Sequence, residues 1–341
     1  MIKHKKKAIS SGSLLNEVLE SIGEGAQLLG SEGLAIKVRG VISTQCVSID
    51  AAIGRGGIPL GRLTILHGAE GSGKTTLALH IVAECQRQNG VAIYMDKEYK
   101  LDPDYARSGI GVDTSRLIIV QPPYLERVFD NCHKIIQKAA AHRTKTGKRV
   151  PILIVLDSMN AAITKAEFEG EWEDKHMAQS ARAFSQLLPK LMPQVHKEDV
   201  ALLFISQIRQ KFNVMFGNAD EVAGGNAPKH WASLILKVTR LGANKEGDEK
   251  VSNKIRVECV KNQIAPPFKK AECDIVYGHG IDKESSLIWL AEKNGVIKRS
   301  GSTYTYADLK IAIGIKALAK KLKEDRKLFS MIKHDVREVG W

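Results

Sequence analysis

A glycine-rich segment in the first quarter of the chain carries a lysine and a threonine at a spacing suited to phosphate chemistry. It reads Gly68-Ala69-Glu70-Gly71-Ser72-Gly73-Lys74-Thr75, continues with Thr76, and matches the pattern GxxxxGK[ST]. Glycines let backbone N–H groups wrap phosphates at a helix N-terminus. Lys74 can reach the β- and γ-phosphates and the Thr75 hydroxyl can bind Mg²⁺. The sequence predicts a nucleotide site, because the strand–loop–helix context disfavours a chance glycine-rich turn.

Acidic residues at the expected ends of neighbouring strands suit the rest of this chemistry. Asp157 closes the apolar run 152–156, where it could hold Mg²⁺ through a water, although a turn or cap is the plain alternative. Hydrolysis also needs a group that activates water. Glu98, just beyond the run 91–95, is the candidate and Asp96 is the competitor, and their spacing does not choose between them.

Short apolar runs alternate with helical stretches through the middle of the chain. The expected strands are 63–66, 91–95, 117–120, 152–156 and 201–205, and the expected helices are about 74–88, 125–141 and 177–195. Continuous apolar strands separated by helices indicate an α/β fold with a mainly parallel sheet covered on both faces. Later strands, around 233–240, 254–261 and 271–277, have no long helix between them and should extend the sheet with hairpins.

The pattern divides the chain into three parts. Residues 1–40 hold a basic arm and an amphipathic helix at 13–22, which either folds back on its own core or docks on a neighbouring subunit. Residues 41–280 hold the nucleotide site, and 281–341 form a small, basic, lysine-rich and mostly helical segment.

Composition excludes several classes of protein. With 341 residues, 43% of them apolar, and a net charge of +13, the chain is an ordinary globular protein with a basic surface. No apolar run approaches the length of a membrane span, and no signal peptide is evident. Five scattered cysteines without a CxxC pair argue against zinc or disulfides and favour a cytoplasmic location. The excess positive charge favours nucleic acid as a partner.

Further motifs follow in a fixed order. They are 49–62 (IDAAIGRGGIPLGR), 95–106 (MDKEYKLDPDYA), 167–177 (EFEGEWEDKHM), 205–211 (ISQIRQK), 214–218 (VMFGN) and 224–227 (GGNA). From about residue 41 to 300 this series resembles the bacterial RecA recombinase family. The resemblance implies a RecA-type P-loop ATPase core, an N-terminal helix that packs on the adjacent protomer, and a small α/β C-terminal domain.

The resemblance also implies a function. It implies an ATP- and Mg²⁺-dependent helical filament, a homo-oligomer on single-stranded DNA, that pairs with homologous double-stranded DNA and exchanges strands in recombination and DNA repair. It assigns Glu98, rather than Asp96, as the catalytic glutamate. Asp102 and Tyr105 match the residues that contact adenine, and Gln207 matches the residue that senses the γ-phosphate.

Two segments, about 169–182 and 208–226, resemble the family's DNA-binding loops. The candidate DNA contacts are the apolar Met177, Phe212, Met215 and Phe216, the cationic Arg182, Arg209 and Lys211, and Gly224, Gly225 and Asn226. Apolar groups can stack on bases, cations can meet phosphates and glycines allow close backbone approach. The alternative is that the apolar residues are core under a folded loop. The basic segment after residue 297 could recruit duplex DNA or be a solvated helix face.

The sequence departs from the family pattern at three positions. Lys261 matches the first of two lysines that reach the neighbouring subunit's nucleotide, but Gln263 replaces the second; Ser206 replaces an asparagine and His230 a phenylalanine. Hydrolysis is therefore expected to be slower, or completed by another cation. The basic C-terminus, without the acidic tail common in the family, is consistent with a divergent or phage-encoded member.

Two other functions remain open at this stage. One is an ATP-gated filament scaffold with little hydrolysis, and the other is a ring helicase on the same core. ATP turnover tests the first, and duplex unwinding without a homologous strand tests the second.

Overall fold

The computed structural model describes residues 11–23, 26, 28, 38–171, 179–210 and 220–340. The chain divides into two compact units, Met1–Lys37 and Val38–Trp341. In the first unit, the predicted amphipathic helix is α1 (Ser11–Ile22), and its apolar side chains Leu14, Leu15, Val18 and Ile22 are exposed. Among the helices in the described ranges, none is long and apolar enough to cross a membrane.

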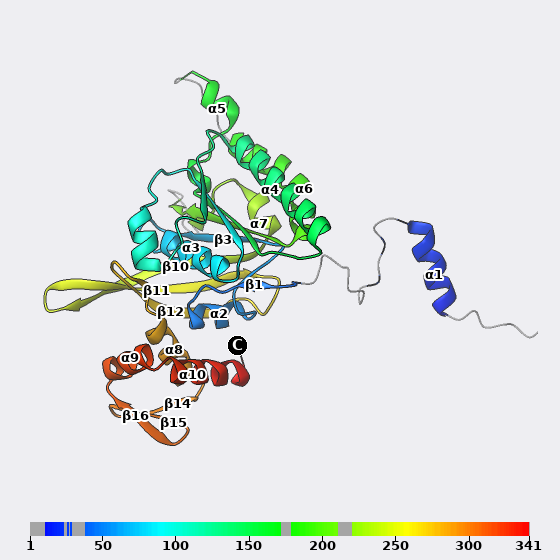
Figure 1. Ribbon diagram of the computed structural model, residues 1–341. Helices are drawn as coiled ribbons and strands as arrows, with labels where there is room; N and C mark the ends of the chain where they lie inside the picture. The colour runs from blue at the N-terminus through cyan, green and yellow to red at the C-terminus, as the bar shows by residue number, and fades with distance from the viewer. Residues whose placement is uncertain are drawn as a thin grey trace, which may run out of the picture. The chain divides into compact units, whose positions relative to one another are not determined.

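A nine-stranded sheet forms the centre of the second unit (Figure 1). In spatial order its strands are β13 (Gly280–Ile281), β12 (Lys270–Val276), β11 (Glu249–Asn262), β10 (Ala232–Glu246), β3 (Leu63–Gly68), β7 (Val200–Gln207), β6 (Ile152–Asp157), β4 (Val91–Asp96) and β5 (Leu117–Val120). From β10 to β5 all neighbours are parallel, whereas β10 to β13 are antiparallel. The predicted parallel sheet with a hairpin extension is therefore confirmed.

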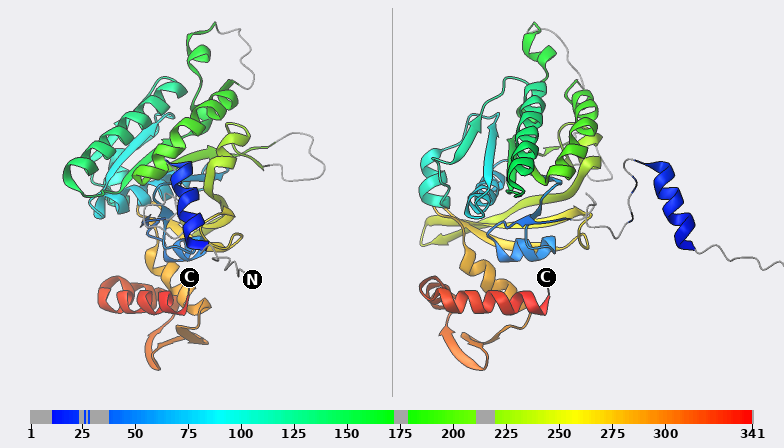
Figure 2. Two further views of the ribbon diagram at one scale, coloured as in Figure 1. Left: turned by 90° about the vertical axis from the view of Figure 1, so that its right-hand side faces the viewer. Right: turned by 45° about the vertical axis from the view of Figure 1, so that its right-hand side comes forward.

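Helices cover both faces of this sheet, as the continuous apolar strands predicted. Along β6, Leu153 and Val155 face the core under α2 (Val47–Ile53) and α3 (Lys74–Arg87). The alternating residues Ile152, Ile154 and Leu156 face the core under α4 (Leu125–Thr146) and α6 (Gln179–Glu198), which lie side by side in Figure 2.

Shorter elements connect these layers. They are β1 (Val41–Ile42), β2 (Ile58–Pro59), a π-helical turn (Tyr105–Ile110), a 3-10 turn (Met159–Ala161), α5 (Lys165–Glu169), β8 (Arg209–Gln210), β9 (Asp220–Glu221) and α7 (Asn226–Trp231). The β10–β11 hairpin extends beyond the main sheet, as the yellow ribbon in Figure 1 shows.

The C-terminal segment holds three helices and a small sheet within the described residues. Its elements are α8 (Lys283–Lys293), β14 (Ile297–Ser300), β15 (Thr303–Tyr306), β16 (Leu309–Ile313), α9 (Ile315–Glu324) and α10 (Arg326–Val339). The three strands form their own antiparallel sheet. The helices make up most of this segment, as the pattern predicted, and the added sheet agrees with the small α/β domain that the resemblance implied. The positions of the strands were not predicted, because they are short and mix lysine, threonine and apolar residues.

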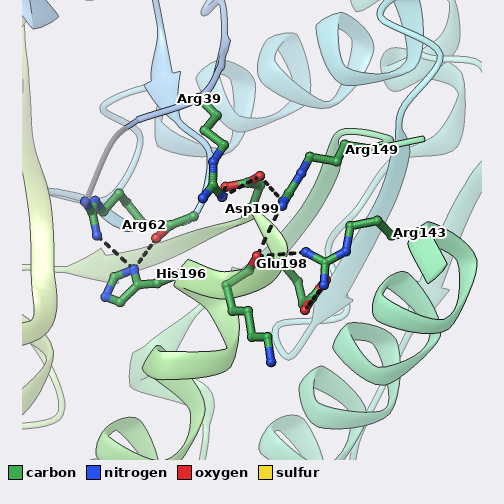
Figure 3. A network of polar contacts seen from close by, with 9 residues as sticks. Arg39, Arg62, Arg143, Arg149, His196, Glu198 and Asp199 are labelled. Carbon is green, nitrogen blue, oxygen red and sulfur yellow. Dashed lines mark hydrogen bonds and ion pairs between the residues drawn. The ribbon is translucent and has the colours of Figure 1, made fainter. Parts of the chain in front are cut away.

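An ionic network ties together the chain at the starting ends of the parallel strands (Figure 3). Asp199, just before β7, pairs with Arg39 at 3.0 Å and also with Arg149, just before β6. Its neighbour Glu198 pairs with Arg143 of α4 at 2.9 Å. Both carboxylates are largely buried, with side chains 8% and 5% exposed. The network joins the segments before β6 and β7 to helices α4 and α6, at the end of the sheet opposite the glycine-rich loop.

Candidate nucleotide-binding site

The glycine-rich loop lies between β3 and α3, as the sequence predicted. β3 ends at Gly68 and α3 begins at Lys74, so the free N–H groups of the first helical turn point out of the loop. Gly71 and Gly73 have φ angles of 67° and 93°, a left-handed backbone that favours glycine. A Cβ on Gly68 would lie 2.2 Å from the Val238 carbonyl oxygen, so a side chain there is excluded.

Lys74 is held inside this loop by main-chain carbonyls. Its Nζ donates to the carbonyl oxygens of Gly68 at 3.0 Å and Ala69 at 2.7 Å. Burial lowers the pKa of Lys74, and the nearby carboxylates of Asp157 and Glu98 oppose that shift. An anionic phosphate is a stronger partner for the ammonium than two neutral carbonyls. The loop is thus arranged to accept one.

Oxygen atoms suited to a divalent cation meet where α3 begins and β6 ends. The Thr75 hydroxyl donates to Asp157 Oδ2 at 2.8 Å. Burial raises the pKa of Asp157, and the nearby carboxylates of Glu98 and Asp96 raise it further. Hydrogen bonds from Tyr94 and Thr75 oppose this shift. A cation would compensate this cluster of buried negative charge. Mg²⁺ takes one or two such oxygens beside phosphates and waters, so the residues fit it.

The structure separates the two competing carboxylates beyond β4. Asp96 Oδ1 accepts hydrogen bonds from the backbone N–H groups of Glu98 at 3.1 Å and Tyr99 at 2.8 Å, so Asp96 shapes the turn. The Glu98 carboxylate instead lines the cavity above the loop. Its Oε1 accepts from Ser158 Oγ at 2.6 Å and from Gln207 Nε2 at 2.9 Å. Glu98 therefore has the better position to act on a molecule bound there.

Gln207 is the last residue of β7. Besides the contact of its side chain with Glu98, its main chain is held by hydrogen bonds to Asn160. Asn160 Oδ1 accepts from the Gln207 backbone N–H at 2.8 Å, and Asn160 Nδ2 donates to the Gln207 carbonyl at 3.2 Å. The preceding Ser206 accepts from the Ala223 N–H at 2.9 Å. Both ends of the second candidate DNA loop are thereby attached to the tip of the strand that carries Gln207.

A cavity of about 430 Å³ joins these residues. Besides the loop it is lined by Glu98, Lys100, Tyr105, Asp157, Gln207 and the ends of β11 and β12. The Tyr105 hydroxyl lies 3.3 Å from Thr76 Oγ1. Asp102 does not line this cavity; its Oδ1 accepts from the N–H groups of Asp104 and Tyr105 at the start of the π-helical turn.

The structure describes part of the candidate DNA-binding set. Met177, Lys211, Phe212, Met215 and Phe216 lie outside the described residues, and Arg209 is placed as the first residue of β8.

Four other candidates are placed on α6 or at the start of α7. Arg182 is exposed on that helix. Gly224 has φ 82°, and a Cβ on it would lie 2.6 Å from the Phe184 ring, while Gly225 directly precedes α7, which starts at Asn226. Close packing on α6 is thus sufficient reason for a glycine at 224.

The residues expected to act across a subunit boundary lie away from this protomer's own cavity. Lys261 Nζ donates to the carbonyls of Lys229 at 2.9 Å and His230 at 3.0 Å. Gln263 is exposed, and its backbone N–H donates to Ser233 at 2.9 Å. Neither lines the nucleotide cavity.

Sequence reasoning missed four polar residues around the site. Ser158 and Asn160 contact Glu98 and Gln207, Lys100 lies 3.4 Å from Glu98 Oε2, and the Tyr94 hydroxyl donates to Asp157 at 2.6 Å. A tyrosine inside an apolar strand reads as core, and Ser158 and Asn160 match no motif by spacing. Lys100 lies inside the 95–106 motif, but nothing in the motif assigned it a role. The roles of Tyr94, Ser158 and Asn160 depend on contacts between separate strands.

A parallel sheet with this loop after β3 and a carboxylate at the end of β6, one strand further along, defines a P-loop nucleotide-binding protein. The family profile described as "RecA N-terminal domain" matches residues 7–282, and "RecA C-terminal domain" matches residues 285–339. The chain therefore belongs to the RecA family of recombinases, whose members are DNA-dependent ATPases.

Individual relatives agree with this assignment. "Protein RecA" of Aquifex aeolicus is 41% identical over 339 residues, covering 99% of this chain and 94% of the relative. "Protein RecA" of Dichelobacter nodosus is 39% identical over 338 residues, covering 99% and 93%. Among solved structures, a RadB recombinase is similar in fold, with a TM-score of 0.52 and 22% identity over 71% of this chain and 98% of that one.

Proposed function

We propose that this chain is a DNA-dependent ATPase that forms a helical filament on single-stranded DNA and promotes homologous pairing and strand exchange. One contact carries the proposal: Gln207, at the start of the second loop, donates to Glu98 in the nucleotide cavity at 2.9 Å. That contact gives the nucleotide and the loop a direct way to influence each other.

In the nucleotide site each residue takes a distinct part. Lys74 and the loop N–H groups hold the phosphates, and Thr75 and Asp157 hold Mg²⁺, which neutralises developing charge on the phosphates when bound. Glu98 accepts a proton from the attacking water, and Ser158 and Gln207 orient its carboxylate. Tyr105, beside Thr76, and Asp102 near it contact the adenine.

Contacts between copies build the filament. On α1 the apolar side chains Leu14, Leu15, Val18 and Ile22 are 44% to 63% exposed, with Glu17 and Glu20 among them. A groove of about 510 Å³ lies beside the edge strand β5, with an apolar floor that includes Ile93, Ile118 and Ile135 and a rim of lysine and arginine. The apolar face of α1 and its two glutamates match the apolar floor and the lysines Lys134, Lys138 and Lys148 of this groove on the next copy. Lys261 then acts on the neighbouring copy's nucleotide.

DNA binds at the two loops and the C-terminal part. The loop cations Arg182, Arg209 and Lys211 meet the backbone of a single strand, and the apolar loop residues stack on bases with little sequence preference. The basic C-terminal elements bind duplex DNA.

The deciding experiment is ATP turnover with and without single-stranded DNA, comparing the wild type with Glu98→Gln. We expect strong stimulation by DNA in the wild type. The substitution should reduce turnover roughly 10²- to 10⁴-fold, the usual contribution of a general base, while ATP still binds. Asp130→Asn, at an exposed carboxylate of α4, is the matched control and should behave as the wild type.

Other results would favour other functions. Full turnover in Glu98→Gln would reject the proposed base. Negligible wild-type turnover together with ATP-dependent DNA binding would favour the filament scaffold, for which Gln263 and Ser206 are the motivating residues. Unwinding of a duplex without a homologous strand would favour a helicase.

A further inference from the structure

A buried tyrosine contacts the carboxylate at the metal site. Tyr94 lies in β4 opposite Val155 of the neighbouring parallel strand β6, while Asp96 lies opposite Asp157. The Tyr94 side chain is 1% exposed, and its hydroxyl donates to Asp157 Oδ2 at 2.6 Å. Thr75 donates to the same oxygen at 2.8 Å. Within the described ranges, no hydrogen bond to the other carboxylate oxygen, Oδ1, is found.

We propose that Tyr94 is a positioning residue for the magnesium ion of the nucleotide site, an inference that rests on the proposed ATPase function. A carboxylate can turn about its terminal bond, whose rotational preferences are broad. The hydrogen bond from Thr75 restricts the rotation of the Asp157 carboxylate only in part, because the same hydroxyl would also bind the metal ion. Tyr94 donates from a buried position in β4, which is paired on both sides, and holds Oδ2 in place. Oδ1 is thereby left for the ion or for its water.

Packing alone does not require the hydroxyl. The ring belongs to the core cluster that includes Leu153, Val155 and Leu203, and a phenylalanine would fill the same volume. A buried hydroxyl needs a partner. Here its partner is the carboxylate proposed to hold the metal, so the hydroxyl acts on the site. Partners that orient a metal ligand in this way typically change metal affinity or activity 10- to 100-fold when removed.

The test measures binding of a fluorescent ADP to the full-length protein while Mg²⁺ is titrated, with no hydrolysis involved. In Tyr94→Phe we expect the Mg²⁺ concentration that half-saturates binding to rise roughly tenfold. Affinity without Mg²⁺ should stay within about twofold of the wild type, since the phosphate contacts remain. Tyr306→Phe is the matched control, because the Tyr306 hydroxyl donates to Asp335 at 2.6 Å in the C-terminal part.

A double variant tests whether Tyr94 acts on the Mg²⁺ requirement through Asp157. If Tyr94 acts through that carboxylate, adding Tyr94→Phe to Asp157→Asn should change the Mg²⁺ requirement less than about twofold. An unchanged requirement in Tyr94→Phe would overturn the inference. So would a loss of affinity that is equal with and without Mg²⁺, since that result indicates general disruption of the fold. A wild type without Mg²⁺-dependent nucleotide binding would instead overturn the proposed function, and this inference with it.

Discussion

The side-chain amide of Gln207 donates a hydrogen bond to Glu98 Oε1 over 2.9 Å, although the two residues come from strands that are not neighbours in the sheet. Asn160 fixes the main chain of Gln207 through two hydrogen bonds, so a movement of Gln207 changes both the cavity and the start of the second loop. Under the proposed function, this contact would couple the nucleotide to DNA.

Removing the side-chain amide of Gln207 should uncouple the nucleotide cavity from the second DNA loop. In Gln207→Ala we expect single-stranded DNA to raise ATP turnover less than about twofold, because the contact that transmits DNA binding to Glu98 is lost. A hydrogen bond to a charged group is worth about 1.5–3 kcal/mol. Turnover with and without DNA, measured at saturating ATP, checks this. Gln137→Ala on α4, where the amide contacts His133, is the control. Normal stimulation in Gln207→Ala would show that the signal takes another route.

Restoring a cation at position 263 should accelerate hydrolysis. Gln263 is exposed in a single protomer and carries no charge toward a neighbour's nucleotide. A preorganised donor at developing charge is worth on the order of 10²-fold in rate, so Gln263→Lys should raise turnover at least about tenfold. The gain should appear with single-stranded DNA, when filaments form, and not in its absence. Gln263→Met, of similar length and neutral, should give no gain. An equal gain in both variants would exclude a charge effect.

The sequence predicted the fold well where a single periodicity decides the structure. Continuous apolar strands such as 152–156 can be buried on both faces only in a helix-covered parallel sheet, and the loop motif fixed the position of β3 and α3. The resemblance implied strands in the C-terminal domain, but the pattern did not locate β14 to β16, because these strands are short and β14 and β16 carry lysines among their apolar residues.

Site residues were predictable where a motif names them and not where contacts define them. Spacing left Asp96 and Glu98 equivalent, since both lie at or just beyond the end of β4. The structure distinguishes them, because Asp96 accepts hydrogen bonds from the backbone N–H groups of Glu98 and Tyr99 and so shapes the turn. Tyr94 carries no motif at all. Its partner Asp157 lies 63 positions further along the chain.

The ionic network around Asp199 should contribute measurably to stability. Asp199 has φ 55°, which asparagine also tolerates, so Asp199→Asn tests the charge rather than the backbone. Arg39 and Arg149 would then lose a shared, largely buried partner, and we expect a loss of roughly 1–3 kcal/mol in the free energy of unfolding. Urea unfolding at pH 7 measures it. Asp130→Asn removes an exposed pair with Arg127 and should cost well under 1 kcal/mol. Equal costs would refute a structural role for the network.

His80 makes the fold sensitive to acid. It lies in α3, where its Nε2 accepts from the Ile281 N–H at 2.8 Å and its Nδ1 lies 3.1 Å from Gln45 Oε1, so the folded protein holds a neutral ring. Burial lowers the pKa of His80 to about 3, with smaller contributions from the charges of Lys283 and Arg87. The contact joins the helix of the nucleotide loop to the strand that leads into the C-terminal part.

Acidification should therefore cost stability between pH 6.5 and about 3. In that window the unfolded chain binds a proton at His80 and the folded one does not, so unfolding becomes more favourable as pH falls, by roughly 2 kcal/mol from pH 7 to 5. Asp50 acts in the opposite direction, because burial raises its pKa to about 6 and the folded state takes up that proton first. A variant separates the contribution of His80 from those of other titratable groups. His80→Gln keeps a hydrogen-bond acceptor for the Ile281 N–H but cannot titrate. Urea unfolding at pH 7 and 5 should show a smaller loss in this variant than in the wild type, and equal losses would mean that His80 does not control acid stability.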